Sequence, residues 1–214
     1  ITNKHKPKEL KSLRQKVGLV FQFPEYQLFE ETILKDIMFG PLNFKVPEAK
    51  AKVLAMNALK LVGLDESFAE KSPLDISGGQ KRRVAIAGIL AIDPEVLVLD
   101  EPTAGLDPQG SKAMMELFVK LNKDSGKTIL IVTHDMEHVI NYCDNVVVMR
   151  EGEVINHQRV TDYFERKTQV EDIHMNLPML LGMKEMLIDG GFSLNQQMRT
   201  IEDLAKAIAM EIKP

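Results

Sequence analysis

The sequence has a single cysteine, Cys143, no tryptophan and no long uninterrupted apolar run. One cysteine excludes an intramolecular disulfide and favours a reducing compartment; its helical spacing from Val139 predicts a place in the core. Apolar stretches such as residues 84–92 are much shorter than the roughly 20 residues that a membrane-spanning helix needs. Because the formal net charge is −4, a nucleic-acid backbone is not expected to be the main partner.

A glycine-rich phosphate-binding loop of the pattern G-x-x-x-x-G-K-[ST] is also missing. The partial match at Gly126-Lys127-Thr128 has Leu121 where the first glycine should stand. This segment leads into a β-branched stretch, whereas a phosphate-binding loop follows a strand and opens a helix. We therefore reject it as a phosphate site.

What the sequence does contain is an alternation of strand and helix patterns. The apolar content of 44% in 214 residues predicts one domain with an appendage. Short apolar runs predict strands, and 3.6-residue periodicity with caps and breakers predicts helices. Strands are expected at 16–22, 96–99 and 128–132, helices at 32–39, 48–62, 77–91, 111–122 and 136–142, and a hairpin at 145–156 around Glu151-Gly152. This order predicts an α/β fold with a parallel sheet.

The last part of the chain has a different character. From Thr161 the sequence becomes rich in Met and Leu at helical spacing, with breaks at Pro178 and at Gly190-Gly191. Thr200 followed three residues later by Asp203 predicts a capping box that opens the final helix. We expect a helical extension here.

Two adjacent acids follow the apolar run 96–99. Asp100 at the end of a buried strand lies where parallel sheets place their ligands, and a carboxylate there can hold Mg²⁺ together with phosphate oxygens. Glu101 points differently and can polarise a water for attack on a γ-phosphate. The alternative is a pair of solvated acids at a strand end, and the flanking residues Pro102 to Asp107 argue against it.

A second group of residues predicts an anion site at a helix start. Ser77, Gly78, Gly79 and Gln80 open a helix, where free amides and the helix dipole attract phosphate and glycines allow its close approach. An ordinary capped helix is the alternative. The basic residues 81–83 fit the site or are surface charges.

Two single residues complete the set. Gln22, at the end of its strand, could reach a metal ion or the attacking water, or be only a polar strand end. His134, between Thr133 and Asp135, could donate a hydrogen bond to a γ-phosphate and so sense its removal.

Together these motifs resemble the ATP-binding cassette (ABC) ATPases over residues 16–156. The resemblance implies a P-loop NTPase-like fold with an inserted helical subdomain, and ATP and Mg²⁺ as cofactors. It implies that Gln22 is the Q-loop glutamine, which touches nucleotide and metal, and that residues 76–80 are the signature motif. Asp100 becomes the Walker B aspartate, Glu101 the catalytic base, Asp107 a nucleotide-side residue of the D-loop, and His134 the switch histidine.

In that family the phosphate-binding loop precedes the Q-loop glutamine. The residues before Val17 are too few for a strand–loop–helix unit of roughly 30 residues. We therefore expect an incomplete chain, without the first strands and Walker A region, that by itself binds ATP feebly. The expected domains are an ATPase part at 1–158, with its helical subdomain at about 24–92, and a helical extension at 159–214.

The chain resembles the energy-coupling-factor branch of this family in residues 17–44, in residues 82–88 and in the helical tail. It resembles the second ATPase paralogue of that branch in Phe23-Pro24-Glu25 and in residues 29–32. That branch imports vitamins or transition-metal ions of the cobalt/nickel type. The resemblance implies a peripheral protein on the cytoplasmic face of the cell membrane. Its partners would be a second ATPase (a paralogue by preference, with an identical copy as the alternative), a transmembrane T subunit and, indirectly, a substrate-binding S subunit. The tail from Val160 would hold the ATPase dimer together.

The segment Phe23–Glu31 mixes aromatic residues with acids. It is expected to form a groove for a basic amphipathic helix of the T subunit, unless its aromatics are packed inside the helical subdomain. Two rival functions remain: a non-transport ABC ATPase of DNA repair or ribosomes, which would predict a long coiled-coil insertion or a basic linker, and an inert fragment.

Overall fold

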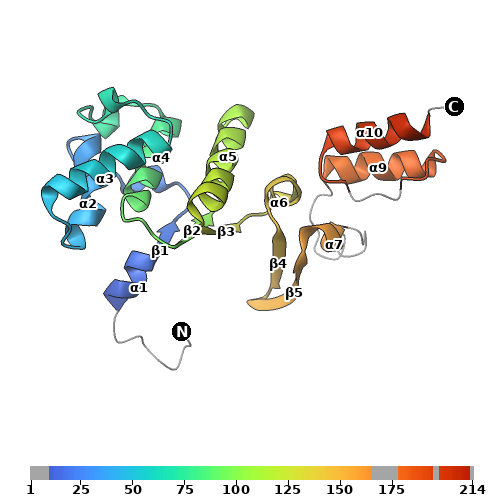
Figure 1. Ribbon diagram of the computed structural model, residues 1–214, viewed down its shortest axis with the longest axis horizontal. Helices are drawn as coiled ribbons and strands as arrows, with labels where there is room; N and C mark the ends of the chain where they lie inside the picture. The colour runs from blue at the N-terminus through green and yellow to red at the C-terminus, as the bar shows by residue number, and fades with distance from the viewer. Residues whose placement is uncertain (1–9, 165–177, 195–197, 213–214) are drawn as a thin grey trace. The chain divides into compact units, whose positions relative to one another are not determined.

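The computed structural model describes residues 10–164, 178–194 and 198–212. The chain forms two compact units, which divide between Val132 and Thr133 (Figure 1). The domain boundary expected at 158 and the subdomain limits of 24 and 92 stay predictions. None of the helices in the described ranges has the length and hydropathy of a membrane span.

The first unit is built on a three-stranded parallel sheet. Its strands are β1 (Val17–Val20), β2 (Val96–Asp100) and β3 (Thr128–Val132), in the order β1-β2-β3. Parallel strands buried by helices are made of continuous apolar residues, and Leu97 and Leu99 of the central strand are fully buried. The predicted α/β class with a parallel sheet is confirmed. β1 is shorter than the predicted 16–22, because Lys16 ends a preceding helix, α1 (Leu10–Lys16), and the chain turns after Val20.

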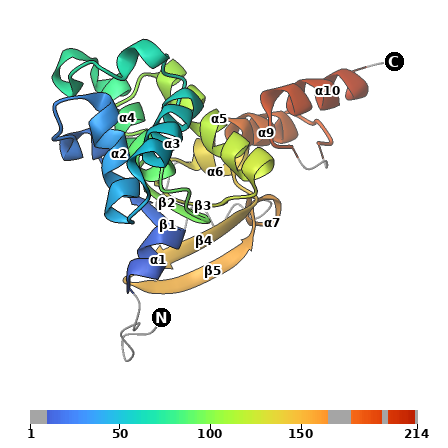
Figure 2. The ribbon, with the colours of Figure 1, turned by 60° about the vertical axis from the view of Figure 1, so that its left-hand side comes forward.

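Three helices of the first unit pack against one another (Figures 1 and 2). They are α2 (Ile33–Asn43), α3 (Glu48–Leu61) and α4 (Gly78–Leu90). The short 3-10 helix η1 (Pro24–Gln27) precedes α2, and η2 (Glu66–Phe68) and η3 (Pro73–Asp75) lie between α3 and α4. All three helices were expected, but α2 continues four residues beyond the expected end at Phe39. Their shared core consists of small and branched apolar side chains: Ile33, Ile37, Ala51, Ala55, Ala58, Leu59, Val84 and Ala87.

The last helix of this unit, α5 (Pro108–Ser125), ends at Gly126, whose positive φ of 63° closes the helix. Met114, Met115 and Phe118 bury its apolar face. The Lys127 ammonium lies 2.6 Å from Asp93 Oδ1, and Thr128 begins β3. Gly126 therefore ends a helix instead of opening one, which confirms that this segment is not a phosphate-binding loop.

The second unit combines a hairpin with short helices. The hairpin strands β4 (Asn145–Arg150) and β5 (Glu153–Arg159) are antiparallel and joined at Glu151-Gly152, both with positive φ, as the sequence predicts. β5 is longer than expected, because it pairs with β4 up to Asn145. The helices in the described part of this unit are α6 (Met136–Tyr142), α7 (Val160–Phe164), α9 (Met179–Asp189) and α10 (Ile201–Glu211).

One apolar cluster holds this unit together. It consists of Met136, Val139, Ile140, Val160, Tyr163, Phe164, Leu180, Leu194, Met198, Leu204 and Ala207. Cys143 packs against this cluster but is half-buried instead of fully enclosed. The capping box of α10 is confirmed, since Thr200 accepts the Asp203 N–H and Asp203 accepts the Thr200 N–H, each at 3.1 Å.

Candidate functional site

The acids and the glutamine predicted to act together follow neighbouring strands at one edge of the sheet. Asp100 is the last residue of β2 and Glu101 comes next, while Gln22 stands two residues beyond β1. Since β1 and β2 are parallel, with Val20 opposite Leu99, their carboxyl ends share that edge. Gln22 is exposed and both acids are half-buried. This is the edge where α/β sheets bind ligands.

Glu101 has a left-handed backbone with φ of 44°. Such a conformation costs a non-glycine residue of the order of 1–3 kcal/mol and clusters at functional sites. Two hydrogen bonds hold it: the Glu101 N–H donates to the Val132 carbonyl at 2.9 Å, and the Glu101 carbonyl accepts the Ala104 N–H at 3.1 Å. Side chains along β2 alternate between the two faces of the sheet, and the left-handed backbone at Glu101 ends this alternation.

The start of α4 has the features of an anion site. Ser77 and Gln80 form a capping box, in which Ser77 Oγ accepts the Gln80 N–H at 3.3 Å and Gln80 Oε1 accepts the Ser77 N–H at 3.0 Å. The amides of Gly78 and Gly79 belong to the first turn and have no helical partner. A Cβ built on Gly78 would meet nothing within 4 Å. Gly78 therefore has open space beside it, while a Cβ built on Gly79 would lie 3.9 Å from Leu106 Cδ2; two free amides beside this space suit a phosphate.

Arg82 is buried, whereas the sequence allowed it to be a surface charge. Its side chain is only 3% exposed and donates through Nε and Nη2 to both carboxylate oxygens of Glu25, at 3.2 and 3.1 Å. Nη1 reaches the carbonyls of Pro102 and Ala104. The surface-charge interpretation is wrong for this residue. Its hydrogen-bond partners lie far away in the sequence, so no local sequence pattern indicated that it would be buried. The neighbouring Arg83 donates to the Val62 carbonyl at 2.6 Å.

Three aromatic residues of the segment Phe23–Glu31 lie at the surface. Phe23, Tyr26 and Phe29, called the aromatic patch below, are 40%, 86% and 63% exposed. The alternative that they are packed inside the helices is therefore wrong. Asp36 fixes the end of this segment by accepting the N–H groups of Phe29 and Glu30 at 3.0 and 2.9 Å.

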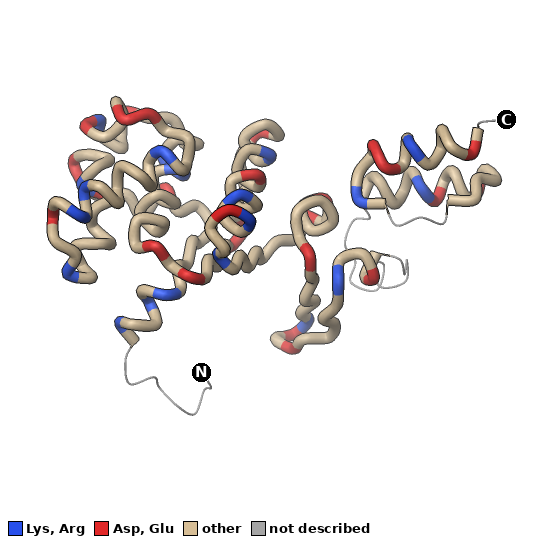
Figure 3. Tube along the Cα trace, in the orientation of Figure 1, with Lys and Arg blue, Asp and Glu red and all other residues tan. Residues whose placement is uncertain are grey.

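The charges around this patch are mixed in sign. Lys35 lies 2.7 Å from Glu31, and this hydrogen bond lowers the pKa of Glu31 and raises that of Lys35. Acidic and basic residues are interspersed along the trace of each unit (Figure 3).

Asp107 is the N-cap of α5, and its Oδ1 accepts the Gly110 N–H at 2.6 Å. His134 belongs to the second unit and stands two residues beyond β3. It precedes Asp135, which caps α6 by accepting the Glu137 N–H at 2.9 Å. The nucleotide roles of Asp107 and His134 stay predictions.

Within the described residues, no group of three or more His, Cys, Asp or Glu side chains could hold a metal ion alone. Mg²⁺ does not need one, because it binds one or two carboxylates together with substrate phosphates and water. Asp100 at the strand end fits this requirement, with Gln22 following the neighbouring strand.

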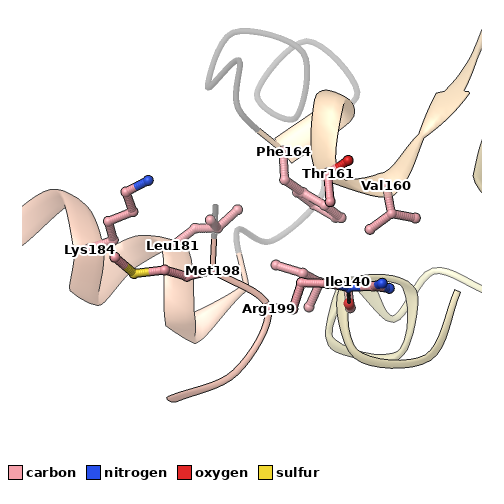
Figure 4. A pocket seen from close by; sticks show the side chains of 8 residues that line it. All are labelled: Ile140, Val160, Thr161, Phe164, Leu181, Lys184, Met198 and Arg199. Carbon is pink, nitrogen blue, oxygen red and sulfur yellow. Dashed lines mark hydrogen bonds between the residues drawn. The ribbon is translucent and has the colours of Figure 1, made fainter. Parts of the chain in front are cut away.

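The second unit also has a small cavity, and none of the predicted site residues lines it (Figure 4). Its lining is Ile140, Val160, Thr161, Phe164, Leu181, Lys184, Met198 and Arg199. Arg199 is committed to the backbone, donating to the carbonyls of Ile140 and Cys143.

An acidic strand end on a parallel sheet, together with a helix that begins with two glycines behind a serine cap, is the arrangement expected of an ABC-type ATPase. Residues 1–104 match the family described as ABC transporter. The chain belongs to the energy-coupling factor transporter ATP-binding proteins of the EcfA2 type, and the predicted family is confirmed. It is 52% identical to EcfA2 of Geobacillus kaustophilus over 209 residues, covering 97% of this chain and 72% of that protein. With EcfA2 of Enterococcus faecalis the identity is 48% over 213 residues, covering 100% of this chain and 74% of the relative.

Solved structures agree with the fold. The structure of cbiO1 from Clostridium perfringens, part of the ABC transporter complex cbiONQ, matches with a TM-score of 0.69 and 43% identity, covering 84% of this chain and 71% of that one. The ATP-binding cassette MJ0796, a dimer in a post-hydrolysis state with ADP and Pi, matches with a TM-score of 0.63 and 34% identity, covering 74% and 69%. The intact protein is accordingly an ATPase of the ABC class.

Proposed function

We propose that this chain is the ATP-hydrolysing part of an energy-coupling-factor importer, in which two ATPase subunits close on ATP. The observation that carries the proposal is the pair Asp100-Glu101 at the end of the central parallel strand, with Glu101 held in a left-handed turn. Relatives named as transporter ATP-binding proteins and a dimeric cassette with ADP and Pi support it.

The residues at the sheet edge divide the chemistry. Asp100 would hold Mg²⁺, which supplies charge neutralisation on the phosphates. The Glu101 carboxylate accepts the proton of a water aimed at the γ-phosphate. Gln22 orients that water or contacts the metal ion from the neighbouring strand.

The remaining motif residues serve the interface with the second ATPase. The Gly78 and Gly79 amides, oriented by the Ser77–Gln80 capping box, bind the γ-phosphate of ATP held by the partner subunit. Asp107 acts beside them at the interface, and His134 donates a hydrogen bond that senses the γ-phosphate. The partner is a paralogue or a second copy of this chain, and the second unit from Val160 onward stabilises their association.

The aromatic patch would receive the transmembrane subunit. Three exposed rings with Glu30 and Glu31 beside them suit a basic amphipathic helix, which buries its apolar face on the rings. The transmembrane subunit in turn carries the substrate-binding subunit. In this proposal the protein works on the cytoplasmic face of the membrane and drives uptake of a vitamin or a transition-metal ion such as cobalt or nickel.

A reconstitution experiment tests the docking surface. The intact ATPase is co-purified with its membrane subunit, with Tyr26→Ser and Phe29→Ser as the variants. The control is Val53→Ser on α3, since Val53 is a similarly exposed apolar residue at 59%. We expect the patch variants to lose the membrane subunit and the control to keep it. Equal retention by all three, or binding to ribosomes or duplex DNA instead, would contradict the proposal.

A further inference from the structure

Arg82 is the one charged side chain that is buried among the residues described by the structure. Burying a guanidinium is costly unless its charge is paired and its N–H groups find acceptors. Here the acceptors come from two segments: the Glu25 carboxylate in η1, and the carbonyls of Pro102 and Ala104 in the loop after β2. One side chain of α4 therefore ties two loops together.

The first of these loops carries the aromatic patch. Glu25 stands between Phe23 and Tyr26, so its carboxylate moves with them. The Phe23 ring centroid lies 5.7 Å from the Arg82 guanidinium, and a Cβ built on Gly105 would lie 3.8 Å from Phe23 Cε1. Phe23 itself has a left-handed backbone, with φ of 56°. A force on the patch is thus applied directly to Arg82.

The second loop carries the candidate catalytic base. Pro102 follows Glu101 immediately, and the Ala104 N–H closes a turn onto the Glu101 carbonyl at 3.1 Å. Both carbonyls that Arg82 holds belong to this turn. The left-handed conformation of Glu101 is maintained only by its surroundings, so a shift of the turn reorients the carboxylate.

We propose that Arg82 is a positioning residue for Glu101, and that the Glu25–Arg82 pair makes ATP hydrolysis depend on occupancy of the aromatic patch. The inference rests on the proposed function. A helix seated on the patch fixes η1, the bidentate pair fixes the guanidinium, and the guanidinium fixes the turn after Glu101. Arginine suits this role because its planar fork transmits orientation, whereas a lysine ammonium is a point charge.

Arg83 provides the matched control. It is the next residue of α4 and carries the same charge, but it donates to the Val62 carbonyl at the end of α3 instead of to the two loops that Arg82 ties together. A change at Arg83 therefore tests the effect of disturbing the helix without touching the link.

The experiment compares the wild type with Arg82→Lys, Glu25→Gln and Arg83→Lys. Each intact ATPase is assembled with its partner ATPase and membrane subunit, and ATP hydrolysis is measured with and without the membrane subunit. Arg82→Lys keeps both charges of the buried pair and loses only the planar fork, whereas Glu25→Gln leaves the guanidinium charge unpaired and is the more destabilising change; if one variant does not fold, the other still tests the link. Thermal unfolding is recorded for each variant.

We expect Arg82→Lys to bind the membrane subunit normally, and both Arg82→Lys and Glu25→Gln to keep the KM for ATP. Their kcat in the full complex should fall roughly 10- to 100-fold, the cost of a misplaced catalytic group, and stimulation by the membrane subunit should be lost. Arg83→Lys should keep both. If the two variants only unfold at lower temperature while the folded protein keeps its kcat and its stimulation, the inference is wrong. Failure of the proposed function is different: the wild type itself would not bind the membrane subunit or hydrolyse ATP.

Discussion

Gly40 of α2 lies directly against α4. A Cβ built on Gly40 would come within 2.8 Å of Ile92 Cγ1 and 3.3 Å of the Gly88 carbonyl oxygen. The first distance is shorter than real Cβ contacts, and the second involves backbone that cannot rotate away. Gly40 therefore sets how closely α2 approaches the helix that carries the signature motif.

Gly40→Ala should lower the free energy of unfolding by about 1–3 kcal/mol, the usual cost of overpacking. Gly88→Ala is the control across the same contact, because its Cβ would meet only ordinary contacts at 4.0 Å. Because Gly88 lies inside the helix α4, Gly88→Ala should leave the free energy of unfolding unchanged or raise it by up to about 1 kcal/mol. Chemical denaturation of both variants measures the difference, and equal stabilities would contradict the packing described.

Asp107→Ala should destabilise the protein by about 1 kcal/mol, because α5 loses its N-cap. Asp107→Asn should restore most of that loss, since asparagine also caps helices well. Thermal unfolding of the two variants separates the capping role from a role at the nucleotide. If ATP hydrolysis falls in both variants while only alanine loses stability, the carboxylate has a separate function. A stable alanine variant would contradict the capping role.

Cys143 should react slowly with alkylating reagents. Burial raises the pKa of its thiol, the nearby Asp144 raises it further, and Arg199 opposes them. The thiolate is the reactive form, so at mildly alkaline pH the folded protein should be labelled more slowly than the unfolded chain. The folded pKa lies above the unfolded one, and this difference reduces stability as pH rises through the unfolded pKa. Equal labelling rates by mass spectrometry, folded and in denaturant, would contradict this.

The capping box of α10 should make the second unit sensitive to acid. Hydrogen bonds from the Arg199 N–H and from Thr200 lower the pKa of Asp203. A folded pKa below the unfolded one stabilises the protein above the unfolded pKa, and this contribution is lost as pH falls through the folded pKa. Asp203→Asn should therefore flatten the acid limb of a stability–pH curve. An unchanged limb would show that the box contributes nothing.

The site was predictable where the signal is local. Asp100 and Glu101 follow an apolar strand directly, and Ser77 precedes its helix with a glutamine three residues later, so a short window of sequence determines each. The burial of Arg82 was not predictable, because Glu25 lies 57 residues away and the pairing depends on how η1 packs on α4. Likewise, the end of β5 depends on pairing with Asn145 and not on its own residues.

The most direct test of the account is ATP hydrolysis by the assembled transporter carrying Glu101→Gln. Glutamine keeps the size of the side chain but cannot accept the proton, so the rate should fall by roughly 10²–10⁴, while ATP still draws the two ATPase subunits together. Glu95→Gln is the matched control, since Glu95 precedes β2, is exposed and pairs with Lys16 at 3.1 Å. A Glu101→Gln complex that hydrolyses ATP at the rate of the wild type would contradict the assignment of Glu101 and the mechanism built on it.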